Sequence, residues 1–184
     1  MNASIKDVRA VILAGGQSRR MGEAKASMPL LGRPLIDWVI QAVSMLEVPS
    51  SVIWDDFVPG LGPLGGVRTA FKRFPEAWFV FLSCDMPFLS KGLLNSLVQS
   101  KGQSAVFYAV DGRISFPFLL TRRYESDVTE NLDLGMRSVR QLSDRLQASQ
   151  ISAPQEDQWR FLNVNTRRDL EEAERLAASR ETLF

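Results

Sequence analysis

The sequence contains no histidine among its 184 residues. This absence excludes Ser-His-Asp triads, zinc sites with histidine ligands, and an imidazole general base. Any catalysis must therefore depend on carboxylates, lysine, arginine, backbone amides or a metal held by carboxylates. Oxygen ligands of this kind suit Mg²⁺, so the composition favours phosphate chemistry over acyl transfer or hydride transfer.

The chain also has a single cysteine and almost no net charge. Cys84 is the only cysteine, so no disulfide forms within the chain, and a reducing, cytoplasmic location is expected. The 22 Lys and Arg residues nearly balance the 21 Asp and Glu residues, leaving a formal charge of +1. Because nucleic-acid binders usually carry a basic excess, we expect no nucleic-acid partner.

Long hydrophobic runs are missing as well. No stretch approaches the roughly 18 apolar residues of a membrane span, and residues 1–10 lack the apolar run of a signal peptide. We therefore expect no membrane partner. Hydrophobic residues still make up 45% of the chain, enough to build a buried core. Since no repeat or linker is visible, a single domain over residues 1–184 is predicted.

Short hydrophobic segments alternate with helical spacings along the chain. Strands are predicted at residues 8–14, 51–54, 77–82, 104–109, 114–120 and 159–164. The fourth and fifth would form a hairpin through Asp111 and Gly112. Helices are predicted at residues 34–46, 67–74, 89–100, 138–146 and 169–179, with a loop at 59–66. The alternation predicts an α/β fold: a doubly wound, mostly parallel, Rossmann-like sheet with helices on both faces.

Three unusual segments follow predicted strands, at residues 15–22, 55–66 and 83–87. Ligands of open α/β sheets bind beyond the carboxyl ends of the strands. The three segments are therefore expected to converge on one ligand site.

The first of these segments has the residues of a phosphate-binding loop. Gly15 and Gly16 let the backbone approach a ligand closely and turn its N–H groups toward phosphate oxygens. Arg19 or Arg20, together with Lys25, can neutralise a triphosphate. The segment matches neither G-x-x-x-x-G-K-[ST] nor G-x-G-x-x-G. The alternative is a surface loop with two glycines and solvated charges.

Asp85 follows the most hydrophobic run of the chain, residues 77–82. A carboxylate at this position can hold Mg²⁺ bridging the phosphates of a nucleotide, which would neutralise charge on a leaving pyrophosphate. The alternative is an aspartate that caps the next helix.

Two further groups of residues are candidates for the same pocket. Asp56 and the glycines of the following turn, Gly62 and Gly66 among them, can line a nucleotide pocket or form a connection without a ligand. Asn163 and Asn165 alternate on a predicted strand, so both side chains would face one side. Alternatively, this segment serves to place Thr166 as the N-cap of the last helix.

Four segments, taken in order, resemble the signature of the molybdenum cofactor guanylyltransferases, the MobA family. The first is Leu-Ala-Gly-Gly-Gln-Ser-Arg-Arg-Met-Gly at residues 13–22, followed by Lys25 and by Leu-Gly-Arg-Pro-Leu-Ile at 31–36. The others are Asp56 with the turn at 59–66, Cys-Asp-Met-Pro at 84–87, and Asn-Val-Asn-Thr at 163–166. Together they span nearly the whole chain.

The resemblance implies a nucleotidyltransferase fold and a reaction that transfers GMP from GTP to molybdopterin-bound molybdenum. Mg²⁺ is the implied cofactor, and pyrophosphate is the implied leaving group. The implied partners are GTP, the molybdopterin or molybdenum cofactor, and molybdoenzyme maturation proteins. In-line attack by the terminal phosphate of the pterin on the α-phosphorus would need no protein nucleophile, so positioning and charge neutralisation would supply the catalysis.

The resemblance also implies roles for individual residues. Nucleotide binding falls to Leu13, Ala14, Gly15, Lys25, Asp56 and Asp85, to which the glycine arguments add Gly16, Gly62 and Gly66. Catalytic roles fall to Arg19, Lys25 and Asp85, and Asp85 is also the implied metal ligand. Asn163 and Asn165 are expected to line the active site.

The chain departs from the family pattern at two points. Ala24 stands where the family commonly has an aspartate before the lysine. Residues 46–53 replace a full second strand and a loop bearing an asparagine. The alternatives are a cytidylyltransferase for the same cofactor, another small nucleotidyltransferase, and a non-catalytic nucleotide-binding accessory protein. Gly-Gly at residues 15–16 and Asn-Val-Asn at 163–165 favour guanine over cytosine.

Overall fold

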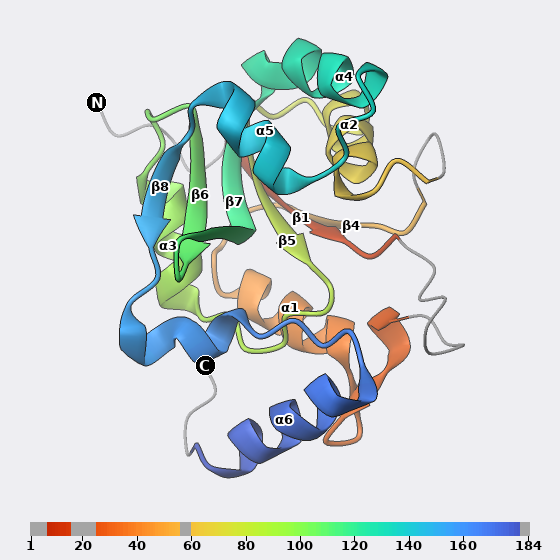
Figure 1. Cartoon of the computed structure of the whole chain (residues 1–184), viewed down its shortest axis with the longest axis vertical. Coiled ribbons are helices and arrows are strands. Elements are labelled where there is room, and N and C mark those ends of the chain that lie inside the picture. Colours follow the sequence, from red (N-terminus) through yellow and green to blue (C-terminus); the bar gives the residue numbers. More distant parts are fainter. Residues whose placement is uncertain (1–6, 16–24, 56–59, 181–184) are drawn as a thin grey trace.

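In the computed structural model, which describes residues 7–15, 25–55 and 60–180, helices cover both faces of a six-stranded sheet (Figure 1). The predicted α/β class is confirmed. The strands are β1 (Val8–Leu13), β4 (Ser50–Ile53), β5 (Trp78–Ser83), β6 (Ala105–Val110), β7 (Arg113–Thr121) and β8 (Ser149–Ser152). Across the sheet their order is β4-β1-β5-β7-β6-β8. Every strand except β7 runs in the same direction.

The antiparallel course of β7 follows from a tight turn. Asp111 and Gly112 join β6 to β7, and both have positive φ, 47° and 72°. Two positive φ values are typical of a type I′ turn, whose twist matches an antiparallel pair. The predicted hairpin is therefore confirmed. The five parallel strands all end at the same edge of the sheet, which we call the carboxyl edge, and start at the opposite, amino edge.

Helices α2, α4 and α5 lie on one face of the sheet, and α1 and α3 lie on the other (Figure 1). The helices are α1 (Leu35–Ser44), α2 (Pro63–Arg73), α3 (Lys91–Gln99), α4 (Glu125–Asp133), α5 (Val139–Leu146) and α6 (Arg167–Ala178). Within the described residues, none of them is both long and apolar enough to cross a bilayer. A small hairpin of β2 (Pro29–Leu30) and β3 (Arg33–Pro34) packs beside α6.

Alternation along β1 divides the core into two layers. Val8, Ala10 and Ile12 pack with the residues of α1 and α3. Val11 and Leu13 pack on the other face, against a group of phenylalanines that includes Phe71 and Phe81. Because both faces are covered, the central strands are hydrophobic nearly throughout. This is why β1 and β5 are predictable from the sequence.

Two sequence predictions about the secondary structure are wrong. The sequence predicts a loop at residues 59–66, but residues 63–66 form the first turn of α2, in which Gly65 N donates to Gly62 O at 3.0 Å. Pro63 suits the first position of a helix, since its missing N–H needs no partner there. Residues 159–164 were expected as a strand, yet a 3₁₀ helix covers Gln155–Phe161.

Other elements have no clear signal in the sequence. One such element is the edge strand β8, which pairs with β6 on the side away from β7. Its four residues are exposed or half-buried and show no hydrophobic alternation. Helix α4 buries only Val128, Asn131 and Leu132. Pro34 lies just before α1, in β3, and not in the first turn of the helix.

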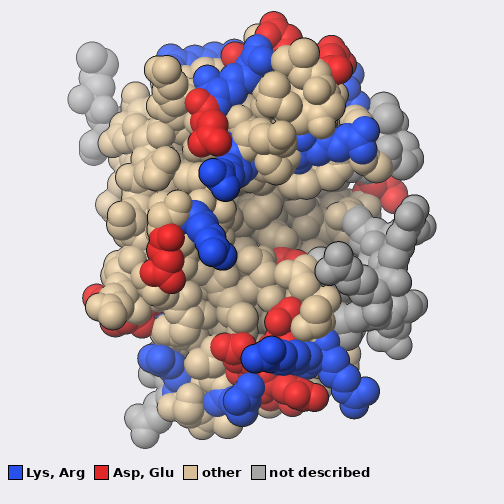
Figure 2. All heavy atoms as spheres, viewed as in Figure 1, with Lys and Arg blue, Asp and Glu red and all other residues tan. Residues whose placement is uncertain are grey.

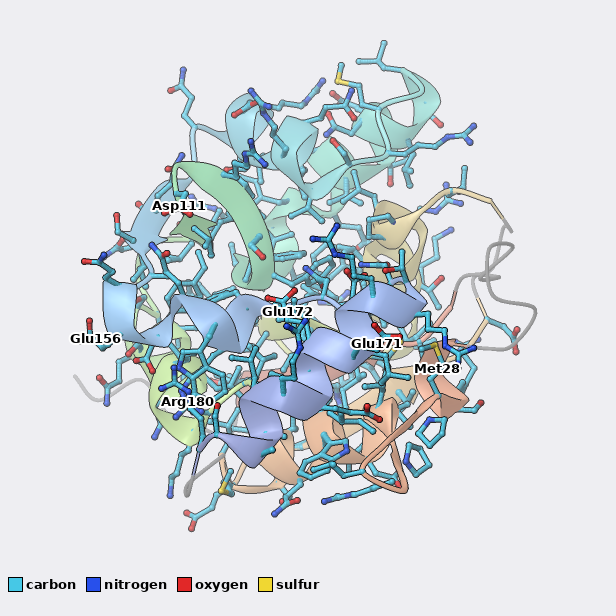
Figure 3. The ribbon with its side chains drawn as sticks, turned by 60° about the horizontal axis from the view of Figure 1, so that its bottom comes forward. Met28, Asp111, Glu156, Glu171, Glu172 and Arg180 are labelled. Carbon is cyan, nitrogen blue, oxygen red and sulfur yellow. The ribbon has the colours of Figure 1, made fainter. Side chains whose placement is uncertain are left out.

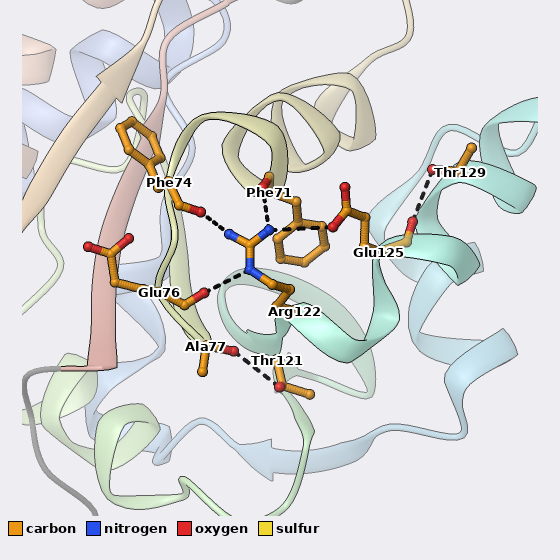
Figure 4. A network of polar contacts seen from close by, with 8 residues as sticks. All are labelled: Phe71, Phe74, Glu76, Ala77, Thr121, Arg122, Glu125 and Thr129. Atoms are coloured by element: carbon orange, nitrogen blue, oxygen red, sulfur yellow. Dashed lines mark hydrogen bonds and ion pairs between the residues drawn. The ribbon is translucent and has the colours of Figure 1, made fainter.

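Arginines tie the strands together at the amino edge. Arg122 follows β7, and its guanidinium donates to the backbone oxygens of Phe71, Phe74 and Glu76 (Figure 4). These bonds satisfy carbonyls at the end of α2 that have no partner within the helix. Arg9 Nη2 donates to Glu76 Oε1 at 2.7 Å. Arg9 Nη1 donates to Ser51 Oγ at 2.8 Å.

Candidate nucleotide site

The ends of three neighbouring strands meet at the carboxyl edge. Ala14 N donates to Ile53 O at 2.9 Å, and Cys84 N donates to Leu13 O at 3.2 Å. The chain beyond β1 therefore starts between the ends of β4 and β5. Leu13, Ala14 and Gly15 are brought beside the segment that contains Asp85, as the sequence predicts.

Asp85 lies in a buried position just beyond β5. Its residue is only 5% exposed, and Ser83 Oγ donates to its Oδ1 at 2.5 Å. The alternative role as a helix cap is not observed, because Ser90 is the N-cap of α3 and accepts from Leu93 N. The carboxylate of Asp85 is thus held by the hydroxyl of Ser83 and does not serve as the N-cap of α3.

The segment with Asn163 and Asn165 lies against Asp85. Val164 N donates to Asp85 O at 2.8 Å. Val164 is fully buried, whereas the two asparagines on either side of it are half-buried. The segment is not the predicted strand, so strand alternation does not set the directions of the two asparagine side chains. Both asparagines flank the buried Val164, whose backbone bonds to Asp85.

Thr166 fulfils the predicted role of a cap on α6. Its Oγ1 accepts from Asp169 N at 3.2 Å, and Asp169 Oδ2 accepts from Thr166 N at 2.8 Å and from Asn165 N at 2.9 Å. This is a capping box, in which two helix-terminal donors are satisfied reciprocally. It fixes the backbone directly after Asn165.

A small hydrophobic cluster anchors the segments that carry the predicted site residues. Met28 lies three residues after Lys25, and Phe88 lies three residues after Asp85. Both belong, with Val164 and Ala173 of α6, to one buried cluster. Packing therefore holds three segments that are far apart in the sequence near one another. Lys25 itself begins a short 3₁₀ helix, Lys25–Ser27.

The glycines of the turn before α2 differ in their positions. Gly62 is the N-cap of α2 and has a φ of 66°. A Cβ at Gly62 would lie 3.3 Å from Arg137 O, so the turn packs tightly against the connection between α4 and α5. Gly66, by contrast, is buried inside α2. The start of α2 lies at the carboxyl edge, because β4 leads into it.

Several predicted site residues lie outside the described part of the chain. They are Gly16, Arg19 and Asp56. Arg20 and Ala24 lie outside it too.

A cavity of about 600 Å³ adjoins the asparagine segment. It is lined by the turn between β6 and β7, by the 3₁₀ helix Gln155–Phe161, and by α6. Figure 3 shows Asp111 on that turn and Glu172 on α6, which both line the cavity. Leu162, another lining residue, lies directly before Asn163. The face seen in Figure 2 is hollowed at its centre, above α6.

This cavity was not foreseen from the sequence. Three separate segments supply its walls, and none of them carries a recognisable motif for a ligand. Gln158 Nε2 donates to Asp111 Oδ1 at 2.9 Å, which joins two of these walls.

The family model of the MobA-like NTP transferase domain matches residues 10–54 and 46–151. The chain belongs to this family. It is therefore a MobA-like nucleotidyltransferase. The two matched segments share residues 46–54, the region that contains β4. Among the described residues, β4 is the one strand between α1 and α2, in agreement with the short connection noted in the sequence.

Named relatives cover nearly the whole chain. A probable molybdenum cofactor guanylyltransferase from Bacillus licheniformis is 32% identical, over 89% of this chain and 95% of the relative. A molybdenum cofactor guanylyltransferase from Serratia proteamaculans is 31% identical, over 89% of this chain and 92% of the relative.

Solved structures confirm the fold. Molybdopterin-guanine dinucleotide biosynthesis protein A from Archaeoglobus fulgidus superposes with a TM-score of 0.73 at 22% identity, covering 94% of this chain and 100% of that one. The 4-diphosphocytidyl-2C-methyl-D-erythritol synthase from Anaerococcus prevotii gives a TM-score of 0.76 at 12% identity, covering 95% and 97%. Because both superpose well, the fold alone does not determine which base is bound.

Proposed function

We propose that this nucleotidyltransferase transfers GMP from GTP to the molybdenum cofactor and releases pyrophosphate. The observation that carries the proposal is the meeting of Leu13–Gly15, Asp85 and the asparagine segment at one edge of the sheet. The relatives at 31% and 32% identity that are named as guanylyltransferases support the same reaction.

The proposed site is suited to a divalent cation of the Mg²⁺ type. Within residues 7–15, 25–55 and 60–180, no group of three acidic or cysteine side chains could enclose a metal by itself. Mg²⁺ differs from other cations in keeping several waters and binding through one or two carboxylates plus substrate phosphates. Asp85, buried beside the end of β1, fits the role of such a single carboxylate ligand. The bound ion would neutralise charge on the phosphates.

The protein's own residues would then position the reactants. Backbone N–H groups from Gly15 onward and Lys25 would bind the triphosphate. A terminal phosphate oxygen of the acceptor would attack the α-phosphorus in line. A new P–O bond would form there as the bond from the α-phosphorus to the bridging oxygen of the β-phosphate breaks. Pyrophosphate would leave with that electron pair, so no residue of the chain need be covalently modified.

The cavity of about 600 Å³ is our candidate for the acceptor side of the site. Its volume lies in the range of small-molecule pockets, about 300–1,000 Å³. It adjoins the asparagine segment through Leu162, and the asparagine segment bonds to Asp85. An acceptor bound there would approach the α-phosphorus from the side opposite β4.

A comparison of nucleotides tests the proposal. Purified protein would be given molybdenum cofactor, Mg²⁺ and either GTP, CTP or ATP, and pyrophosphate release would be measured. We expect release with GTP well above that with the other two. A clear preference for CTP would replace the guanylyl assignment by a cytidylyltransferase. Binding of GTP without any release would instead support a non-catalytic accessory protein.

A further inference from the structure

Trp54 lies at the carboxyl end of the edge strand β4, beside the proposed nucleotide site. It directly follows β4, whose last residue, Ile53, pairs with Leu13 of β1. The hydrogen bond from Ala14 N to Ile53 O continues this ladder by one step. Trp54 is therefore the neighbour of Ala14, at the point where the chain leaves β1 toward Gly15.

The exposure of Trp54 sets it apart from the other aromatic side chains. Its residue is 54% exposed, whereas every other tryptophan, phenylalanine and tyrosine in the described part of the chain is buried or half-buried. Aromatic side chains carry a large apolar surface, and most of it is normally removed from water on folding. An aromatic ring left in solvent at a ligand-binding edge is available for a ligand.

The alternation along β4 indicates which side Trp54 occupies. Val52 packs with the core layer beneath α1, and Ile53 packs with the opposite layer. The next residue in this pattern returns to the α1 side. Ala14 also packs against the layer beneath α1, so the two neighbours lie on the same side of the sheet.

We propose that Trp54 stacks against the base of the bound nucleotide. This inference rests on the proposed function, and it assigns the base to the edge strand β4. The face of an indole ring attracts the flat face of a base, and such stacking is sequence-tolerant but stronger for larger rings. A purine covers more of the indole than a pyrimidine does. Trp54 would therefore favour GTP over CTP.

The test measures equilibrium binding of nucleotides to the full chain with Mg²⁺ and without acceptor, by calorimetry. Trp54→Ala is expected to raise the Kd for GTP about tenfold, and Trp54→Phe, which keeps a stacking ring, by about threefold or less. The increase for CTP should be smaller than that for GTP. Leu134→Ala is the matched control, since Leu134 is 63% exposed just after α4 and should leave both Kd values unchanged.

Kinetics and fluorescence separate a stacking role from a structural one. In Trp54→Ala the KM for GTP should rise while kcat stays within about twofold of the wild type, because stacking stabilises ground and transition states alike. GTP should quench tryptophan fluorescence in the wild type, and most of this quenching should be lost in Trp54→Phe. Melting temperatures of all variants should match the wild type.

The results distinguish a failure of the stacking role from a failure of the proposed function. If the wild type binds GTP and Trp54→Ala binds it equally well, the stacking role is overturned and the proposed function stands. If the wild type binds no nucleotide, both proposals fail. If Trp54→Ala weakens CTP as much as GTP, Trp54 gives no preference for purines.

Discussion

The two edges of the central sheet differ in what their side chains do. At the amino edge, two arginines make the polar contacts that join the strands: Arg122 donates to three backbone oxygens, and Arg9 is paired with Glu76. At the carboxyl edge, Asp85 is buried, Trp54 is exposed, and Gly62 has a positive φ. The first arrangement stabilises the fold, whereas the second belongs to the proposed nucleotide site.

This contrast has a practical consequence. Substitutions at the amino edge should change the free energy of unfolding and leave turnover alone. Substitutions at the carboxyl edge should do the reverse.

The largest effect is expected from Asp85→Asn. The amide still accepts a hydrogen bond from Ser83 Oγ, so the fold should be preserved, but the charge that would hold the metal is lost. We expect turnover to fall about 100-fold or more, with a melting temperature close to that of the wild type. Pyrophosphate release and thermal unfolding measure the two quantities. Wild-type turnover in this variant would remove Asp85 from the mechanism.

Arg122→Ala is the corresponding change at the amino edge. It leaves the carbonyls of Phe71 and Phe74 at the end of α2 without this donor, and it removes a guanidinium that lies 5.4 Å from the ring centre of Phe79. The free energy of unfolding should fall by about 2–3 kcal/mol, as measured by urea denaturation. The neighbouring Arg123→Ala is the control, because Arg123 is exposed and contacts Tyr124. A loss of turnover at low temperature, with stability intact, would contradict the separation of the edges.

Lys25→Ala changes a residue of the proposed nucleotide site and should weaken nucleotide binding. The proposed contact with the triphosphate is a charge-assisted one, so its loss should raise the Kd for GTP about tenfold. Because the contact is made to phosphate, the Kd for ATP and CTP should rise by the same factor. Calorimetry with the three nucleotides measures this. An unchanged Kd for GTP would exclude Lys25 from the phosphate site.

The smallest effect concerns the pH dependence of stability. The hydrogen bond from Arg9 lowers the pKa of Glu76 below its ordinary value of 4.5. Since the folded-state pKa is the lower one, the ion pair stabilises the fold fully above pH 4.5, and this contribution is lost as pH falls through the folded pKa. We therefore expect the free energy of unfolding to decrease as the pH falls below 4.5.

Glu76→Gln is the variant that isolates this group. Its free energy of unfolding should be lower than that of the wild type at pH 7, and the difference should shrink as the pH falls below 4.5. Urea denaturation at several pH values measures both curves. A constant difference from pH 7 to pH 3 would show that the carboxylate of Glu76 does not titrate as described.

The sequence predicts best those elements whose signal is local. β1 and β5 are nearly continuous hydrophobic runs, α1 has a clear helical hydrophobic period, and Asp111-Gly112 has the residues of a tight turn. The first residue of α2 cannot be predicted from the sequence, because Pro63 and the glycines that follow it are typical of a loop. The segment 159–164 resembles a strand because it is rich in aromatic and aliphatic residues, but it forms the end of a 3₁₀ helix and a loop that bonds to Asp85.

The candidate site likewise has features that short sequence segments predict and features that depend on contacts between distant segments. The meeting of Leu13, Ala14 and Gly15 with the Asp85 segment is predictable, since strand ends of a parallel sheet share an edge. The cavity beside the asparagine segment is not, because its walls come from three unrelated stretches. Trp54 is not predictable either: only the direct pairing of β4 with β1 brings it next to Ala14.

The path of the GTP phosphates tests the central proposal most directly. The wild-type protein would be given molybdenum cofactor, Mg²⁺, and GTP labelled with ³²P at either the α- or the γ-phosphate. The account predicts that the α-label enters the cofactor and that the γ-label leaves in pyrophosphate. Transfer of the γ-label to the cofactor, or no transfer of the α-label, would contradict it.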